Sequence, residues 1–541
     1  MPRIETRGDP APSADLLAQA ALARIPKILT LLDRNPHSPT YGCGDRLFWH
    51  YRAIDFPSGM AQEFVWPLAL AYDTPLPDNR FYREPALRHW VEAGIRYAAS
   101  SAHADGSCDD YYPYERATGA AAFSLLACLE SYQLLDLRDR ALIAFFARRA
   151  NWLAACKETG ILSNHQALVV LCLTRVGELL ETSQWERAKA RRLERLLDWQ
   201  CSEGWFPEYE GCDPGYQTLT VACLARVHQR QPDGRLQDAL ARAVELAACF
   251  LHPDGSYGGE YGSRNTYNFF PHGFELLGQW WPEALRINDG FLAGLARGLA
   301  PWDTDDRTIG HHAWNYLLAW RDFVPERPSP QPRRQGRIWL RQARILIDRR
   351  QDTELYLALN KGGTFKLFRR DQLVASDTQL SLQVQQGRWL RNAVAHLVDA
   401  YDTEIDENTV TVCGRLGWAK QTQMTPAKLL LLRCAMLTVG RFWPNAIRWL
   451  LQRLLIVGKE DAPFSFRRRL HWDGRAWCVQ DELHGSSWAQ VRQVGIGGHQ
   501  SSIYVVMSRP FQDGQLQPWL DLSDRLPALK AGEPLRVVRR F

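Results

Sequence analysis

Three short stretches of the sequence place hydrogen-bonding side chains at the start of an apolar run. Asn164 and His165 open "SNHQALVVLCL", Tyr216 lies near the start of "DPGYQTLTVACL", and His272 follows a proline in "FFPHGFELL". If each run is a helix, these side chains lie in its first turn, where free N–H groups and a partial positive charge attract an anion. Arg264, in "GSRNTYN", adds a full positive charge in a neighbouring loop. An amide, an imidazole and a phenol beside a bound anion can hold it and transfer protons.

Local helix signals position these side chains. In "SNHQ", Ser163 is the expected N-cap and Gln166 completes a capping box, which puts Asn164 and His165 in the first turn. Asp213 can cap the next helix, with a proline at its first position. These signals predict that the polar side chains sit at helix N-termini.

A weak internal repeat organises roughly the first 320 residues. Apolar helical runs are separated by turns whose first glycines are Gly106, Gly160, Gly204 and Gly255, at intervals of about 45 to 55 residues. Such a period is typical of stacked helical hairpins. In the best-defined pair, the first helix is apolar all round and the second has an apolar stripe, so we expect inner and outer helices. The repeat predicts an α/α toroid whose parallel inner helices gather their N-termini at one end.

An Asn-His pair that opens an inner helix, followed about fifty residues later by a Gly-Tyr pair, resembles the heparinase II/III-like and alginate-lyase-like polysaccharide lyases. Those enzymes join an α/α toroid to an antiparallel β-sandwich and cleave uronic-acid polysaccharides by β-elimination. The resemblance implies that Asn164 hydrogen-bonds the substrate carboxylate and that His165 helps to bind it or removes the proton. It implies that Tyr216 acts as base, acid or both. Neutralising the carboxylate stabilises the enolate that forms as the carbon-bound proton leaves.

Further residues in the same turns are expected to bind an acidic polysaccharide or oligosaccharide. Arg264 and His272 are expected from the repeat, two phenols lie in the same loops, and a tryptophan ring can stack on a sugar. The set is Arg264, His272, Tyr267, Tyr209 and Trp205.

Beyond residue 336 the sequence is typical of strands. Segments such as "TQLSLQVQQG" and "TVTVCGRLGW" alternate apolar and polar residues between turn residues. We therefore expect a multidomain α + β protein. It has an N-terminal incomplete (α/α) toroid at 1–323, a Pro-rich linker at 324–336 and a C-terminal antiparallel β-sandwich at 337–541.

The lyases that the chain resembles usually carry a histidine-bearing segment after an early strand of the sandwich, often at a metal centre. The corresponding segment here, "ALNKGGTFKLFRRDQL", contains no histidine. No cofactor is therefore predicted, and a metal on the β-sandwich has no support in the sequence.

A helical segment at about 425–459 is unexpected in a sandwich. Its charges are too frequent for a transmembrane span. Arg433, Arg441 and Arg448 share one helical face opposite Leu, Phe and Trp, and Pro444 divides the run. Such a segment fits packing against the toroid, self-association, or contact with a membrane interface. We favour packing.

Composition excludes some partners. The net charge of +5 comes from 65 basic and 60 acidic side chains that form no long basic run, so nucleic acid is not an expected partner. The N-terminus lacks the apolar region of a secretory signal, and the 12 cysteines are scattered singly. We expect a cytoplasmic protein, with peripheral contact at the inner membrane as a variant.

Three other functions fit parts of the sequence. A toroidal glycoside hydrolase would use two carboxylates. Candidate acids in the funnel loops are Asp105, Asp109, Asp110, Glu208 and Glu210. A non-catalytic carbohydrate-binding or exopolysaccharide-assembly protein would keep the funnel and lack the chemistry. A terpene cyclase would use the acids of "DTDD" at 303–306, where an acidic turn is the plainer interpretation.

Overall fold

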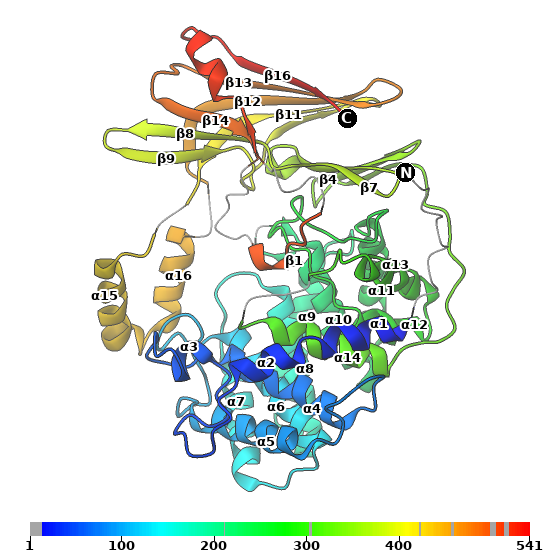
Figure 1. Ribbon diagram of the computed structural model, residues 1–541, viewed down its shortest axis with the longest axis vertical. Coiled ribbons are helices and arrows are strands. Elements are labelled where there is room, and N and C mark those ends of the chain that lie inside the picture. The colour runs from blue at the N-terminus through cyan, green and yellow to red at the C-terminus, as the bar shows by residue number, and fades with distance from the viewer. Residues whose placement is uncertain are drawn as a thin grey trace.

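The computed structural model describes residues 13–209, 211–301, 306–420, 423–455, 459–497, 505–512 and 519–541. Helices dominate up to Arg321, and from Gly336 on the chain forms strands with one helical insertion. Figure 1 shows the strands as layers stacked on one end of the helical body. The predicted fold class, an (α/α) toroid followed by an antiparallel β-sandwich, is confirmed.

The inner helices of the toroid are buried on nearly all sides. They are α4 (Val65–Asp73), α6 (Thr118–Leu134), α8 (Ser163–Leu179), α10 (Pro214–Arg230), α12 (His272–Gly278) and α14 (Ile309–Arg321). Each packs against the next, and α14 packs against α4, so these helices surround a common axis. Runs such as "TGAAAFSLLACL" suit this position because a helix enclosed on every side needs small or apolar residues all round.

The outer helices present a polar face to solvent and an apolar stripe to the inner ring. They are α1 (Ala14–Leu22), α5 (Pro85–Ser100), α7 (Arg140–Ala155), α9 (Glu186–Trp199), α11 (Gly234–Cys249) and α13 (Pro282–Ala296). Short helices α2 (Ile25–Leu31) and α3 (Arg46–Trp49) and the 3-10 turn Met60–Phe64 join α1 to α4. Consecutive inner and outer helices pack as pairs, as the repeat predicts.

The glycines of the predicted turns share one backbone conformation. At Gly106, Gly160, Gly204 and Gly255 φ lies between +85° and +96°, and Gly42, which the sequence analysis did not single out, has φ +90°. At four of the five, a Cβ atom would lie 2.2–2.6 Å from a backbone atom of an outer helix; at Gly160 the nearest atom is 3.6 Å away, in a side chain. A left-handed turn pressed against a helix requires glycine. The repeat is therefore a repeat of backbone geometry.

The predicted caps are partly wrong. Helix α8 begins at Ser163, and its N-cap is Leu162, which makes no side-chain cap bond. The Ser163 hydroxyl instead donates to the Pro207 carbonyl at 2.6 Å, so the predicted capping box with Gln166 does not form. The predicted cap at Asp213 is confirmed, because its carboxylate accepts a first-turn N–H of α10.

The C-terminal domain consists of two antiparallel sheets. The smaller follows chain order: β3 (Gly336–Leu340), β4 (Ile345–Arg350), β5 (Thr353–Ala358), β6 (Thr364–Arg369) and β7 (Gln372–Asp377). The larger has the order β15-β14-β8-β9-β11-β12-β13-β16, with β10 beside β11. Its strands are β8 (Leu380–Gln386), β9 (Trp389–Val394), β10 (Asp402–Ile405), β11 (Thr409–Trp418), β12 (Asp461–Trp472), β13 (Trp477–Gly485), β14 (Val491–Ile496), β15 (Leu520–Asp521) and β16 (Leu535–Arg540).

The smaller sheet is buried on both faces, between the toroid and the larger sheet (Figure 1). Ile345, Ile347 and Tyr356 belong to the core of the toroid. Leu346 and Leu357 belong to the core between the sheets. Because successive side chains of a strand point to opposite faces, two buried faces require the continuous apolar runs "RILI" and "ELYLAL".

The insertion forms two helices that pack on the toroid. Helix α15 (Pro426–Ala435), a π-helical turn (Met436–Gly440) and α16 (Pro444–Leu455) follow one another. The guanidinium of Arg433 lies 2.8 Å from Asp55, and that of Arg448 donates to the Glu115 carbonyl at 2.6 Å. No helix among the described ranges is long and apolar enough to cross a membrane.

Candidate functional site

A two-stranded hairpin brings an acidic side chain to the start of α8. Strands β1 (Pro207–Glu208) and β2 (Gly211–Cys212) join α9 to α10. Glu208 forms a β-bridge with Leu162, and the Tyr209 N–H donates to the Ile161 carbonyl at 2.7 Å. The Ser263 hydroxyl also donates to the Glu208 carbonyl, at 3.1 Å. The hairpin is thus fixed between the N-termini of α8 and α10 and the loop that follows α11.

The Glu208 carboxylate is the centre of the candidate site. Asn164 Nδ2 donates to Glu208 Oε2 at 2.8 Å, and Arg264 Nη1 donates to Oε1 at 3.3 Å. Glu208 is 2% exposed. Burial raises the pKa of Glu208 to about 7, although Arg264, His165 and Asn164 each act in the opposite direction. The group therefore exchanges its proton near neutral pH.

Arg264 lies between two phenol rings. Its guanidinium carbon is 4.8 Å from the ring centre of Tyr209 and 4.7 Å from that of Tyr216. The Arg264 backbone N–H donates to Asp213 at 2.9 Å, so the residue that caps α10 also fixes the arginine loop. Burial raises the pKa of Tyr216 to about 12, and the charge of Arg264 opposes that rise. The arginine is placed to stabilise a phenolate.

Two polar atoms of the cluster are buried without a partner in the described part of the chain. They are Asn164 Oδ1, an acceptor, and Arg264 Nε, a donor. Buried polar groups in proteins are nearly always hydrogen-bonded. An unpaired acceptor and an unpaired donor beside one carboxylate are the features that a polar ligand would satisfy.

His165 has a carboxylate partner of its own. Its Nδ1 lies 2.7 Å from Glu158 Oε1, and its ring packs so closely on Gly119 that a Cβ there would lie 2.7 Å away. Burial lowers the pKa of His165, but the charge of Glu158 and its hydrogen bond outweigh burial, and the pKa is raised. The side chain is 23% exposed, so the imidazole remains accessible.

A basic cavity of about 300 Å³ lies beside His165, between the toroid and α16. Its charged lining residues are Arg116, Lys157 and Arg448, with no carboxylate among them. Thr118 and Lys157, on its wall, adjoin in sequence the Gly119 and Glu158 that contact His165. A positively charged space large enough for a small polar group thus lies close to the residues that hold His165.

Three of the predicted binding residues lie outside the Glu208 cluster. His272 Nε2 is 2.7 Å from Asp322, and burial lowers the pKa of His272 to about 4. The phenol of Tyr267 donates to Glu260 at the boundary with the β-domain. The Trp205 indole donates to Glu203 at 3.1 Å. The cluster thus brings together Asn164, His165, Tyr216, Arg264 and Tyr209 of the predicted set.

His272 is displaced because α12 begins deeper in the ring than α10. A Cβ on Gly273 would lie 2.6 Å from the Ala222 Cα, in the third turn of α10. Tyr216 lies in the first turn of that helix. The two side chains therefore sit at different depths along the axis.

The β-domain fixes the loop that carries Arg264. Lys361, in the segment that lacks the expected histidine, donates to the carbonyls of Glu260 and Gly262 at 2.6 and 2.8 Å and to the Asn265 side chain. Burial lowers the pKa of Lys361 to about 7. Among the residues that the structure describes, no group of three or more His, Cys, Asp or Glu side chains could hold a metal ion.

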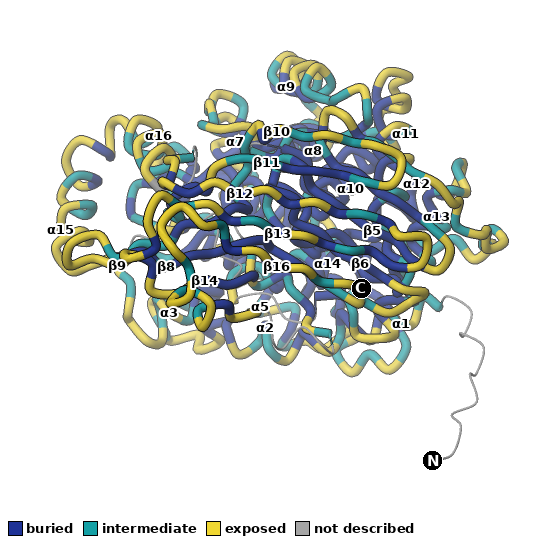
Figure 2. Tube along the Cα trace, turned by 90° about the horizontal axis from the view of Figure 1, so that it is seen from above, coloured by how far each residue is buried: buried dark blue, intermediate teal, exposed yellow. Residues whose placement is uncertain are grey.

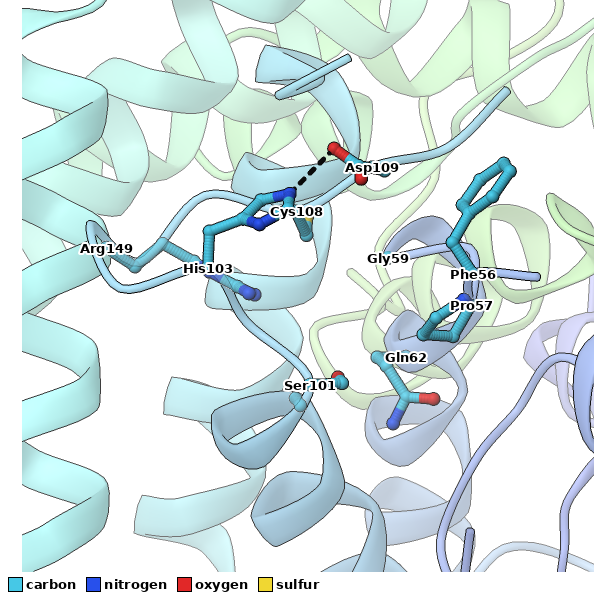
Figure 3. A pocket seen from close by; sticks show the side chains of 10 residues that line it. Phe56, Pro57, Gly59, Gln62, Ser101, His103, Cys108, Asp109 and Arg149 are labelled. Atoms are coloured by element: carbon cyan, nitrogen blue, oxygen red, sulfur yellow. Dashed lines mark hydrogen bonds and ion pairs between the residues drawn. The ribbon is translucent and has the colours of Figure 1, made fainter. Parts of the chain in front are cut away.

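The carboxylates proposed for hydrolysis are mostly held in turns. Figure 3 shows Asp109 beside a cavity of about 90 Å³, with its Oδ1 2.9 Å from His103 Nε2. Asp109 also accepts the backbone N–H groups of Tyr114 and Arg116. Glu210 and residues 302–305, which include most of the "DTDD" acids, lie outside the described residues.

Sequence reasoning missed the partners that organise the site. Glu158 and Lys361 carry no motif, and their roles depend on loops that approach from other parts of the chain. The sequence predicts Glu208 only as an acid for hydrolysis. Its position one residue before Tyr209, in a turn between two predicted helices, was the available signal.

The comparisons with known proteins concern the fold. Searches of protein-family models and of curated protein sequences find no match. Among solved structures, the chain is similar to a chondroitin AC lyase from Streptomyces coelicolor A3 in complex with chondroitin sulphate, with a TM-score of 0.54 and 11% identity. That alignment covers 93% of this chain and 70% of the other.

A xanthan lyase from Paenibacillus has a TM-score of 0.52 and 11% identity, over 89% of this chain. The present chain spans only 46% of the length of that enzyme. At such identities the likeness concerns architecture, and it agrees with the resemblance seen in the sequence. The chain has the toroid-plus-β-domain fold of these polysaccharide lyases.

Proposed function

We propose that the chain is a lyase-like enzyme that cleaves a uronic-acid-containing polysaccharide or oligosaccharide by β-elimination. The observation that carries the proposal is the Glu208 cluster, in which Arg264 lies between Tyr209 and Tyr216 and shares a carboxylate with Asn164. The fold it shares with a lyase solved with chondroitin sulphate supports the same conclusion.

The cluster supplies each group that the elimination needs. Asn164 and Arg264 bind the uronate carboxylate, so that negative charge moving onto it in the transition state is stabilised. The phenol of Tyr216 removes the proton on the adjacent carbon, donates a proton to the leaving glycosidic oxygen, or does both in turn. One C–H bond and one C–O bond break, and a carbon–carbon double bond forms. Arg264, 4.7 Å from the ring centre, stabilises the phenolate form.

Glu208 sets a condition on binding, because it already occupies the donors that would neutralise a uronate. Two full negative charges against one arginine would repel each other. With a pKa of about 7, Glu208 carries a proton in much of the population near neutral pH. A protonated Glu208 can share the site with a second, ionised carboxylate. The basic cavity beside His165 offers a place for another acidic group of the same chain.

The test is the ultraviolet absorbance of the unsaturated uronate that elimination creates. We expect new absorbance with at least one chain among alginate, glucuronan, heparin-like and chondroitin-like substrates, and a loss of about 10²- to 10⁴-fold in Tyr216→Phe. Tyr316→Phe is the matched control, because that phenol is buried in the toroid core and its oxygen has no hydrogen-bond partner among the described residues. Absence of absorbance with every chain, or full activity in Tyr216→Phe, would refute the proposal.

A non-catalytic carbohydrate-binding or exopolysaccharide-assembly role is the second candidate. It is favoured by one observation, namely that Asn164 Nδ2 and Arg264 Nη1 are both engaged by Glu208. Tight oligosaccharide binding that survives Tyr216→Phe, with no turnover in either form, would select it. Saturated reducing ends without absorbance would instead select a hydrolase.

A further inference from the structure

The helical insertion exposes an apolar surface. Ten apolar side chains of the insertion, in α15, the π-helical turn, α16 and the two residues before α16, are between 43% and 71% exposed. They are Leu429, Leu430, Leu431, Leu437, Val439, Phe442, Trp443, Trp449, Leu450 and Leu454. We call these ten residues the insertion face. Exposed apolar patches of this kind mark interaction sites in soluble proteins.

The orientation of the insertion explains why this face is uncovered. Arg433 pairs with Asp55, Arg441 lies 5.5 Å from the Tyr114 ring, and Arg448 donates to the Glu115 carbonyl. The insertion therefore contacts the toroid through its arginines. This arrangement is the reverse of a helix that packs into a protein core, where the apolar side turns inward.

A second element extends the surface. The hairpin of β8 and β9 presents Trp389 and Leu390 at the start of β9. They are 64% and 53% exposed, and the Arg388 guanidinium lies 4.9 Å from the Trp389 ring. Figures 1 and 2 place this hairpin and α15 at the same side of the molecule. Two segments that are distant in sequence thus contribute exposed tryptophan to one side.

Charge identifies the partner. Residues 423–455 contain five basic side chains and no acidic one: Lys428, Arg433, Arg441, Arg448 and Arg453. Three of these arginines contact the toroid, but Lys428 and Arg453 are exposed. A second copy of the chain on this face would bring these like charges together, whereas an anionic lipid surface complements them. Tryptophan and phenylalanine interspersed with basic residues are typical of helices that lie in the headgroup region of a bilayer.

We propose that the insertion face and the β8–β9 hairpin dock the protein on an anionic membrane surface. The apolar side chains enter the headgroup region, and exposed Lys428 and Arg453 contact lipid phosphates. This docking places α16, and with it the basic cavity that α16 helps to line, close to the bilayer. The proposal stands independently of the chemistry at Glu208.

Co-sedimentation of the full chain with vesicles tests the proposal. We expect binding to phosphatidylcholine vesicles that contain phosphatidylglycerol, and much weaker binding to phosphatidylcholine alone or at high salt. The double variant Phe442→Ser/Trp443→Ser should bind at least about tenfold more weakly. Lys428→Ala should bind about fivefold more weakly, since one basic residue near an anionic surface contributes about that factor.

Trp280→Ser is the matched control, because Trp280 is 44% exposed at the junction of α12 and α13 in the toroid. It should bind vesicles like the unmodified protein. Equal sedimentation of the double variant and the control would overturn the proposal. Analytical ultracentrifugation gives a second outcome that would overturn it: the wild type is a dimer, the double variant is a monomer, and neither binds vesicles. The insertion face would then join two copies of the chain.

Discussion

Two glutamates, the buried Glu208 and the half-buried Glu130, lie toward opposite ends of the same pair of inner helices. Glu208 sits at the N-termini of α8 and α10, where it is bound by Asn164 and by one arginine at 3.3 Å. Glu130, on α6, accepts from Arg175 of α8 at 2.8 Å and from Arg226 of α10 at 2.6 Å. Arg175 and Asn164 are separated by roughly 16 Å along α8, at 1.5 Å per residue.

The difference lies in how completely each charge is compensated. Burial would raise the pKa of Glu130, but Arg226 and Arg175 outweigh it and lower the pKa to about 2. At Glu208 burial prevails over a single arginine, and the pKa rises to about 7. A carboxylate held by two arginines is a permanent ion that ties helices together. A carboxylate with incomplete compensation can exchange its proton and its partners, which is what a reactive site requires.

The largest expected effect is a difference in the free energy of unfolding when each of the two glutamates is replaced by glutamine. Glu130→Gln removes the carboxylate that Arg175 and Arg226 share, leaves Arg175 with Glu178 alone, and should lower the free energy of unfolding by about 3 kcal/mol. Glu208→Gln removes a carboxylate whose ionised form is disfavoured by burial, so its free energy of unfolding at neutral pH should be unchanged or higher. Chemical denaturation of both variants at pH 7 measures the difference. Equal destabilisation would show that Glu208 is also a structural ion.

An arginine-to-lysine exchange at each end should separate activity from stability. Arg264→Lys keeps the charge but loses the planar group that lies between Tyr209 and Tyr216, so turnover should fall about a hundredfold with the fold intact. Arg226→Lys keeps a cation near Glu130 and should lower stability by about 1 kcal/mol, with turnover unchanged. Absorbance assays and thermal unfolding on both variants give the comparison. A stability loss in Arg264→Lys that matches its activity loss would argue against a role in the reaction.

The sequence predicts the helices and turns that hold these two glutamates better than it predicts the chemistry of the glutamates. Gly106, Gly160, Gly204 and Gly255 could be recognised because a left-handed turn demands glycine at each of them. Asp213 could be recognised as a cap, since helix N-terminal signals are local.

What the sequence could not supply are contacts made across the fold. The capping box at Ser163 fails because a hairpin from residues 207–212 takes the serine hydroxyl. The depth of His272 depends on how closely Gly273 packs against Ala222. The pairing of Glu158 with His165 likewise depends on how the loop before α8 folds back on that helix. None of these follows from spacing alone.

The smallest expected effect is a pH dependence of ligand affinity that comes from the Glu208 end of α8 and α10 and not from the Glu130 end. Below pH 7 Glu208 carries a proton and tolerates a second carboxylate, whereas above pH 7 it is ionised and repels one. Affinity for an acidic oligosaccharide should therefore fall about tenfold between pH 6 and pH 8, because only the protonated fraction binds well. Titration calorimetry on Tyr216→Phe, which we expect to bind without turnover, measures this dependence. Adding Glu208→Gln should abolish it, while Arg226→Lys, at the Glu130 end, should leave it intact. A flat profile in the Tyr216→Phe protein would mean that the ligand does not meet Glu208, and that the two ends of these helices differ in stability alone.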